Sequence, residues 1–129
     1  MPLTEQHKIV VVVDDEPELV AIVCEVLADE GITAVACDHG TDALVCIVRE
    51  RPSLVVLDVQ MPGMDGIQIF EQLRANPQTM ATPVIFFTAN SYIVTQRLPN
   101  YSAQHAVLLP KPFDLDTLID LVQHLLSSS

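Results

Sequence analysis

Three aspartates follow two short apolar runs of the sequence, at positions where their carboxylates could act together. Asp14 and Asp15 come directly after a run that ends at Val13, and Asp58 comes directly after Leu54–Leu57. If the two runs are neighbouring parallel strands, the three carboxylates converge on one small volume and repel one another. A hard divalent cation such as Mg²⁺ removes this conflict because it prefers carboxylate, carbonyl and water oxygens. The spacing therefore predicts a Mg²⁺ site.

Two further side chains suit the chemistry of such a site. Thr88 follows the apolar run Pro83–Phe87, and Lys111 comes shortly after Ala106–Leu109. When a phosphoryl donor is present, a carboxylate can attack phosphorus and become an aspartyl phosphate. An ammonium and a hydroxyl would then stabilise the charge on the phosphoryl oxygens. Each of the five residues alone has an ordinary explanation, such as a helix N-terminus or a turn, but their joint placement after strands favours a site.

The elements that would position these residues alternate along the chain. Short runs rich in Val, Ile and Leu are typical of strands buried on both faces, and segments of helical periodicity separate them. Strands alternating with helices predict an α/β fold, a doubly wound five-stranded parallel sheet of order 2-1-3-4-5. The predicted strands are Lys8–Val13, Ile32–Cys37, Leu54–Leu57, Pro83–Phe87 and Ala106–Leu109. The predicted helices are Glu16–Glu30, Thr41–Glu50, Gly66–Ala75 and Asp114–Leu126, with a further one within Asn90–His105.

Helical periodicity also predicts which sides of the helices are buried. We expect the helix within Asn90–His105 to be short or irregular, because Pro99 cannot lie deep in a helix. Apolar residues at three- and four-residue spacing mark the buried stripes of the first two helices. The stripes are Leu19, Ile22, Val23, Val26 and Leu27 in the first, and Leu44, Val45 and Val48 in the second.

Composition limits the classes of protein that the chain could be. Its 129 residues fit one domain, with a core at about 8–126 and tails at 1–7 and 127–129. A formal charge of −11 disfavours binding to nucleic acid or to anionic membranes. No stretch approaches the roughly 20 apolar residues of a membrane span. No secretory signal precedes the first apolar run, so we expect a cytoplasmic protein.

The three cysteines, Cys24, Cys37 and Cys46, cannot all pair and lack the spacing of a metal site. Each lies among apolar neighbours, so we expect buried, reduced thiols.

The motifs after four of the predicted strands resemble those of the receiver domain of two-component response regulators. They are VVDDEP at residues 12–17, LDVQMPGMDG at 57–66, TA at 88–89 and KPF at 111–113. The resemblance covers nearly the whole chain, from Lys8 to about Leu126, and the second and fourth motifs together are highly specific. It implies the CheY-like form of the flavodoxin-like fold, and the function of a phosphoacceptor in a phosphorelay.

The resemblance implies a set of ligands for Mg²⁺. Asp15 would bind the ion directly, and Asp14 would bind it through water. Asp58 and the backbone carbonyl of Gln60 would complete the protein ligands.

The resemblance also implies how the phosphoryl group is held and where it comes from. Asp58 would be the phosphoacceptor, Thr88 the switch hydroxyl, and Lys111 the partner of the phosphoryl group, with a cis bond between Lys111 and Pro112. The phosphoryl group would come from a phosphohistidine on a histidine kinase or phosphotransfer protein. We therefore expect a signalling module and not an enzyme, acting as a monomer or a transient dimer.

The chain departs from the family pattern in the region that normally responds to phosphorylation. Leu108 occupies the place of an aromatic residue that turns inward when the switch hydroxyl moves. Gln104-His105 replaces a common Gly-Ala pair, and Pro99 and Pro110 are further departures. We hypothesise that signalling instead relies on reordering of Asn90–His105.

Other functions on the same fold remain as alternatives. A nucleotide-binding oxidoreductase or a flavodoxin-like carrier needs a Gly-rich or Ser/Thr-rich phosphate loop after the first strand, where this chain has acids. A phosphohydrolase that uses Asp58 as nucleophile needs a general acid two residues later, where Gln60 cannot serve. A pseudo-receiver that binds partners without phosphorylation is the closest alternative, because the switch region is altered.

Overall fold

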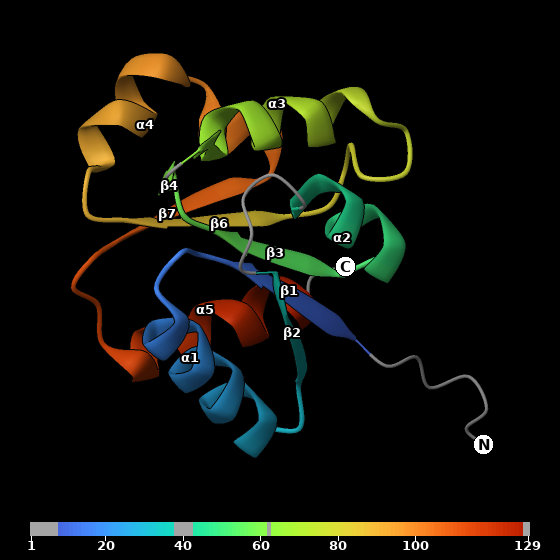
Figure 1. Cartoon of the computed structure of the whole chain (residues 1–129), viewed down its shortest axis with the longest axis vertical. Helices are drawn as coiled ribbons and strands as arrows, with labels where there is room; N and C mark the ends of the chain where they lie inside the picture. The colour runs from blue at the N-terminus through green and yellow to red at the C-terminus, as the bar shows by residue number, and fades with distance from the viewer. Residues whose placement is uncertain (1–7, 38–42, 62, 128–129) are drawn as a thin grey trace.

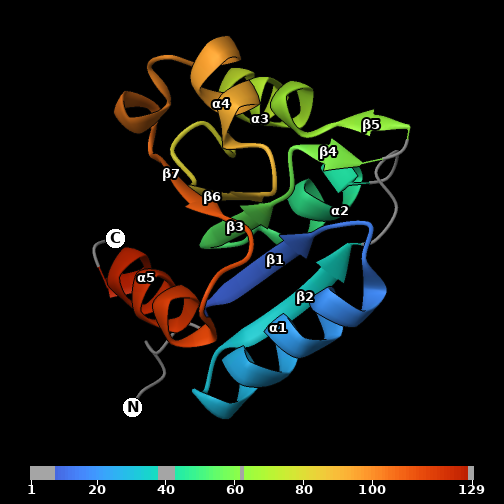
Figure 2. The ribbon, with the colours of Figure 1, turned by 90° about the vertical axis from the view of Figure 1, so that its left-hand side faces the viewer.

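The computed structural model describes residues 8–37, 43–61 and 63–127, and it has the predicted α/β architecture. The five-stranded parallel sheet has the order β2-β1-β3-β6-β7, which is the predicted order 2-1-3-4-5. Helices cover both of its faces (Figures 1 and 2). The strands are β1 (Ile9–Val13), β2 (Thr33–Cys37), β3 (Leu54–Leu57), β6 (Val84–Thr88) and β7 (Ala106–Pro110).

The helices lie close to their predicted positions. They are α1 (Pro17–Asp29), α2 (Ala43–Glu50), α3 (Gly66–Ala75), α4 (Ser91–Arg97) and α5 (Leu115–Ser127). The predicted first two residues of α2, at 41 and 42, lie outside the described residues, as do residues 1–7 and 128–129 of the predicted tails. Ser127, predicted to begin the C-terminal tail, is instead the last residue of α5. The helix within the segment Asn90–His105 is short, as predicted, and the rest of the segment is irregular. Its helix α4 ends before Pro99, and a 3₁₀ turn at Tyr101–Gln104 leads to β7. Within the described residues, no helix combines the length and apolar character needed to cross a bilayer.

The central strand β1 shows why the apolar runs are continuous. Val11 and Val13 pack into the layer of α2, α3 and α4, whereas Val10 and Val12 pack against α1 and α5. Successive side chains of a strand point to opposite faces, so a strand between two helical layers needs apolar residues at every position. All four valines are fully buried.

Two predicted helix faces are wrong in part. Helix α1 buries Val20, Val23 and Leu27 and leaves Ile22 exposed. Helix α2 buries Ala43, Cys46 and Ile47 and leaves Val45 exposed. Both helices carry apolar residues on more than one side, so periodicity alone does not select the side that meets the sheet.

The prediction of three reduced thiols is also wrong. Cys37, the last residue of β2, forms a disulfide with Cys46 in α2, and Cys24 is the free, half-buried thiol. The Cα atoms of the pair lie 6.4 Å apart, a separation that a disulfide spans readily. The sequence did not indicate this approach, because it arises from the return of the chain from β2 onto the sheet.

A short antiparallel hairpin not expected from the sequence follows the third strand of the sheet. It pairs β4 (Gln60–Met61) with β5 (Met64–Asp65) and leads directly into α3. Gly66 begins α3 against the backbone of the residues that follow β3. A Cβ atom at Gly66 would overlap the Asp58 carbonyl oxygen and lie 2.8 Å from the Val59 Cα atom.

We predict that Gly66→Ala lowers the free energy of unfolding by about 3 kcal/mol or more, because the clash is with backbone that cannot move aside. Urea unfolding would measure the change. Gly31→Ala is the matched control: its φ is +79° with open space around a Cβ, so it should cost only the roughly 1–2 kcal/mol of a left-handed backbone. Equal losses in the two variants would contradict the proposed close approach.

Candidate functional site

The three aspartates come together at the carboxyl edge of the sheet. Asp14 follows β1, and Asp58 follows the adjacent strand β3. Asp14 is fully buried, Asp58 is 5% exposed, and Asp15 is exposed. One carboxylate oxygen from each of the three residues lies within 4.8 Å of the others. The predicted convergence of the acids is therefore present in the structure.

Lys111 reaches into this acid cluster from the end of β7. Its Nζ atom donates hydrogen bonds to Asp14 Oδ2 at 2.7 Å and to Glu16 Oε1 at 2.9 Å, and it lies 3.6 Å from Asp58 Oδ2. The backbone N–H of Lys111 donates to the Thr88 carbonyl at 2.8 Å, which fixes the base of the side chain. The Lys111–Pro112 peptide bond is cis, as the resemblance implied.

The buried groups of the site carry more negative than positive charge, and their pKa values are shifted. Burial, together with the nearby Asp58 charge, raises the pKa of Asp14 to about 6, against the lowering effect of the hydrogen bond from Lys111. Burial also raises the pKa of Asp58. Burial disfavours the Lys111 ammonium, but hydrogen bonds to Asp14 and Glu16 more than offset this and raise its pKa. One ammonium therefore faces several carboxylates.

This imbalance fits a bound cation. Three carboxylates with oxygens this close together, two of them buried, form a donor set of the kind that Mg²⁺ prefers. A divalent cation would offset the negative charge that Lys111 leaves uncompensated.

Thr88 and Gln60 lie at the same edge of the sheet. Thr88 is the last residue of β6, is 1% exposed, and accepts a hydrogen bond from the backbone N–H of Asn90 at 3.0 Å. Gln60 begins β4, and its backbone N–H donates to Asp58 Oδ1 at 3.3 Å. Of the six residues proposed from the sequence, five thus follow or end strands at one edge of the five-stranded sheet, and Gln60 begins the hairpin that follows β3.

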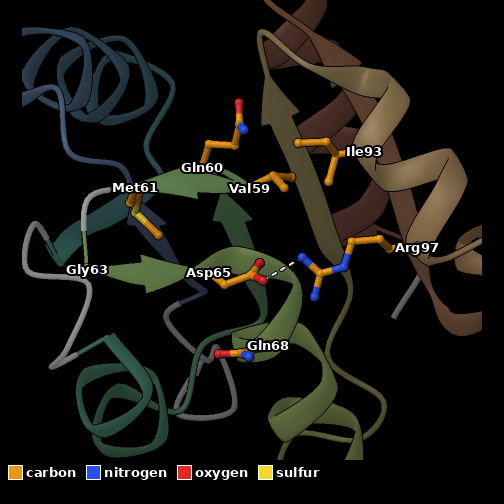
Figure 3. A pocket seen from close by; sticks show the side chains of 8 residues that line it. All are labelled: Val59, Gln60, Met61, Gly63, Asp65, Gln68, Ile93 and Arg97. Carbon is orange, nitrogen blue, oxygen red and sulfur yellow. Dashed lines mark hydrogen bonds and ion pairs between the residues drawn. The ribbon is translucent and has the colours of Figure 1, made fainter.

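Two pockets flank the acid cluster. The first, of about 600 Å³, lies between the β4–β5 hairpin, α3 and α4 (Figure 3). Across it, Arg97 Nη1 of α4 pairs with Asp65 Oδ2 at 2.5 Å. The second, of about 450 Å³, lies between α1 and the loop from β7 to α5. It is lined by Glu16, Leu19, Ile22, Ala89, Lys111, Pro112, Phe113 and Leu115.

The sequence of residues 10–123 matches the response regulator receiver domain family. The chain belongs to this family. Receiver domains are signalling modules, and the acid cluster of this one has the composition that suits phosphorylation and Mg²⁺.

Curated relatives of this receiver domain are longer proteins. The DNA-binding transcriptional regulator NtrC of Salmonella typhimurium is 32% identical over 122 residues, which are 95% of this chain and 25% of NtrC. The transcriptional regulatory protein TcrA of Mycobacterium tuberculosis is 36% identical over 109 residues, which are 84% of this chain and 42% of TcrA. The chain thus spans about a quarter to a half of the length of the curated relatives it matches.

Solved receiver domains share the fold over nearly the whole chain. The apo receiver domain of nitrogen regulatory protein C aligns with a TM-score of 0.81 and 31% identity, covering 96% of this chain and 98% of that one. The response regulator TrrA of Thermotoga maritima, solved in complex with Mg²⁺ and BeF, aligns with a TM-score of 0.76 and 30% identity. That alignment covers 92% of this chain and 98% of TrrA.

Two charged contacts of this receiver were not predicted. The sequence places Glu16 only at the start of the predicted helix Glu16–Glu30, yet it is a direct partner of Lys111. Its position right after the acid pair is the signal that could have indicated this. No local sequence pattern indicated the pair of Asp65 and Arg97. The two residues are 32 positions apart and meet only through the packing of α3 and α4.

We predict that Asp14 makes the metal-free domain less stable as the pH rises. Its pKa is about 6 in the folded state against 3.8 for a free side chain, so its favourable contribution is complete below pH 3.8 and is lost through pH 6. Between pH 4 and 7.5, the free energy of unfolding of the wild type relative to Asp14→Asn should fall by on the order of 2–3 kcal/mol.

Urea unfolding in the presence of a chelator would measure this difference at the two pH values. Asp15→Asn removes the same charge from an exposed position and should change the pH dependence less. A wild type that gains stability relative to Asp14→Asn as the pH rises would show that Lys111 outweighs burial.

Proposed function

We propose that this receiver accepts a phosphoryl group on Asp58 from a phosphohistidine of a histidine kinase or a phosphotransfer protein. The observation that carries the proposal is the contact of Lys111 Nζ with both buried carboxylates, 2.7 Å from Asp14 and 3.6 Å from Asp58. An ammonium held at this position can pair with a phosphoryl oxygen once the group is bound to Asp58. The receiver family to which the chain belongs supports the same function.

The proposed Mg²⁺ ligands are the carboxylates of Asp14, Asp15 and Asp58 and the backbone carbonyl of Gln60, with Asp14 acting through water. When bound, Mg²⁺ would neutralise negative charge on the phosphoryl group and the acids. TrrA, a relative with 30% identity, was solved with Mg²⁺ and BeF.

The proposed transfer needs few groups from the protein. A carboxylate oxygen of Asp58 attacks phosphorus, the bond from phosphorus to the histidine nitrogen breaks, and that nitrogen keeps the electron pair. Lys111 offsets charge on one phosphoryl oxygen, and the Thr88 hydroxyl donates a hydrogen bond to another. The Thr88 hydroxyl oxygen accepts a hydrogen bond from the N–H of Asn90, at the start of α4, so a shift of this hydroxyl towards the phosphoryl group would be transmitted to α4.

This hydrogen bond suggests how phosphorylation reaches the surface. Movement of Thr88 would remove the acceptor that Asn90 now uses, and α4 follows directly. Leu108 packs against the core beside this region, where other family members carry an aromatic residue. We therefore propose that the interaction surface around β6 and β7 changes by reordering of Asn90–His105.

The kinase or phosphotransfer protein is proposed to dock at the pocket between α1 and the loop from β7 to α5. Ile22 is 47% exposed on α1, and Leu19 and Phe113 line the same pocket. Lys111 also lines it, so a partner seated there places a histidine close to the acid cluster. Exposed apolar side chains beside a reactive site are typical of a protein-binding surface.

The remaining proposals concern compartment and partners. We propose a cytoplasmic protein that is a monomer or a transient dimer and binds neither nucleic acid nor membranes directly, since its formal charge is −11. NtrC is a DNA-binding regulator, but this chain covers only a quarter of it. The alternative is a pseudo-receiver that binds partners without phosphorylation.

We predict that incubation with acetyl phosphate and Mg²⁺ adds the mass of one phosphoryl group to the wild type and none to Asp58→Asn. Intact mass spectrometry at early times would detect the product. Asp114→Asn, an exposed acid near Lys111, is the control and should be phosphorylated normally. Absence of phosphorylation in the wild type would favour the pseudo-receiver.

We predict that Ile22→Glu slows phosphoryl transfer from a phosphorylated histidine phosphotransfer domain by about tenfold or more, because it places a charge in the apolar pocket. The donor domain is one that phosphorylates the wild type, and transfer is followed by gel. Phosphorylation by acetyl phosphate should stay within about twofold. Val45→Glu, which adds the same charge at an exposed position of α2, should leave both rates unchanged. A normal rate of transfer to Ile22→Glu would exclude docking at this pocket.

A further inference from the structure

The disulfide joins the edge of the sheet to the helix that covers it. Cys37 is the last residue of the edge strand β2, and Cys46 lies within α2. Both cysteines are buried, with 6% and 9% of their surface exposed, whereas the adjacent Val45 is 65% exposed.

The surroundings of the pair favour thiol chemistry. The Arg49 guanidinium Nη2 lies 3.7 Å from Cys46 Sγ, as a hydrogen-bond donor to the sulfur. A cation beside a sulfur favours the thiolate, which is the form that reacts with peroxides and disulfides. The free Cys24 differs, because burial raises the pKa of its thiol.

The disulfide is also connected to the acid cluster by the pairing of β2 with β1. Cys37 is paired in register with Val13 of β1, and Asp14 follows Val13. The disulfide to α2 therefore restrains the end of β2. This end is paired with the end of β1, which directly precedes Asp14 and Asp15. Release of Cys37 would loosen the end of an edge strand, which has a hydrogen-bonded neighbour on only one side.

We propose that Cys37 and Cys46 form a reversible redox site that controls the order of the acid cluster. Oxidised, the pair preorganises the end of β1 for phosphorylation, and reduced, it relaxes that end. The cytoplasm proposed above is a reducing compartment, where a disulfide is as a rule transient or redox-sensing. The redox chemistry does not rest on the proposed function, but its effect on phosphorylation does.

The oxidant is a peroxide and the reductant is a dithiol. The Cys46 thiolate attacks one peroxide oxygen, the O–O bond breaks, and a sulfenic acid forms with release of hydroxide. The Cys37 thiolate then attacks the sulfenic sulfur, forms the S–S bond and expels a second hydroxide, and protons from the two thiols convert both hydroxides to water. In reduction, a dithiol exchanges through a mixed disulfide, closes to its own disulfide and returns both thiols.

The experiment uses the full chain with Cys24→Ala, so that only the pair remains. Protein treated with hydrogen peroxide or with dithiothreitol is alkylated to count its thiols. Its melting temperature and its initial rate of phosphorylation by acetyl phosphate and Mg²⁺ are then measured. Cys37→Ala and Cys46→Ala, each made in this background, are the controls, since alanine keeps a small apolar side chain at a buried position.

We expect two thiols after dithiothreitol and none after peroxide. Reduction should lower the melting temperature by about 10 °C, because the disulfide closes a loop and so lowers the entropy of the unfolded chain, even though the loop is short. It should also slow phosphorylation by at least about threefold, since the acids are no longer preorganised. The two Ala variants should match the reduced protein and ignore redox treatment.

The proposal is overturned if the two thiols resist peroxide, if dithiothreitol cannot open the disulfide in the folded protein, or if phosphorylation proceeds equally fast in both states. Failure of both states to be phosphorylated would refute the proposed function instead. Hydrogen exchange of Ile9–Val13 then decides the redox inference: faster exchange after reduction supports it, and unchanged exchange overturns it.

Discussion

The interaction on which the site depends is the contact between one ammonium and the carboxylates buried around it. Lys111 Nζ lies 2.7 Å from Asp14 and 3.6 Å from Asp58, which are both buried. Burial still raises the pKa of both acids, so the lysine satisfies only part of their charge. Buried acids whose negative charge is only partly compensated destabilise the fold. A cation bound there would supply the missing positive charge and could then hold a phosphoryl group. The site is therefore built from charges that are not balanced within the protein itself.

The rest of the fold holds these charges in place. Valines buried on both faces fix β1 between the two helical layers, and its register with β2 and β3 places Asp14 beside the end of β3. On the other side, the N–H of Lys111 bonds to the Thr88 carbonyl, so that the last strand delivers the lysine to the same edge. Gly66 lets α3 begin against the backbone of Asp58 and Val59. Small displacements of any of these elements would alter the distances between the charges.

The two sides of the site are connected to different elements of the fold. Towards α4, the Thr88 hydroxyl and the pair of Asp65 with Arg97 connect the site to a short, irregular segment. Towards β2, the disulfide between Cys37 and Cys46 fastens the edge of the sheet to α2. The proposed response to phosphorylation lies on the first side, and the proposed redox site lies on the second. The pocket between α1 and the loop from β7 to α5 leaves Ile22 exposed.

Sequence alone determined the order of the strands, the short α4 and the residues of the candidate site. It could do so because continuous Val-, Ile- and Leu-rich runs mark buried parallel strands, and such strands bring their carboxyl ends to one edge. It did not determine which face of α1 and α2 is buried, because both helices are apolar on several sides. It also missed the disulfide, the Glu16 contact with Lys111 and the pair of Asp65 with Arg97. These contacts join residues that no local pattern relates, and only the packing of helices on the sheet brings their side chains within reach.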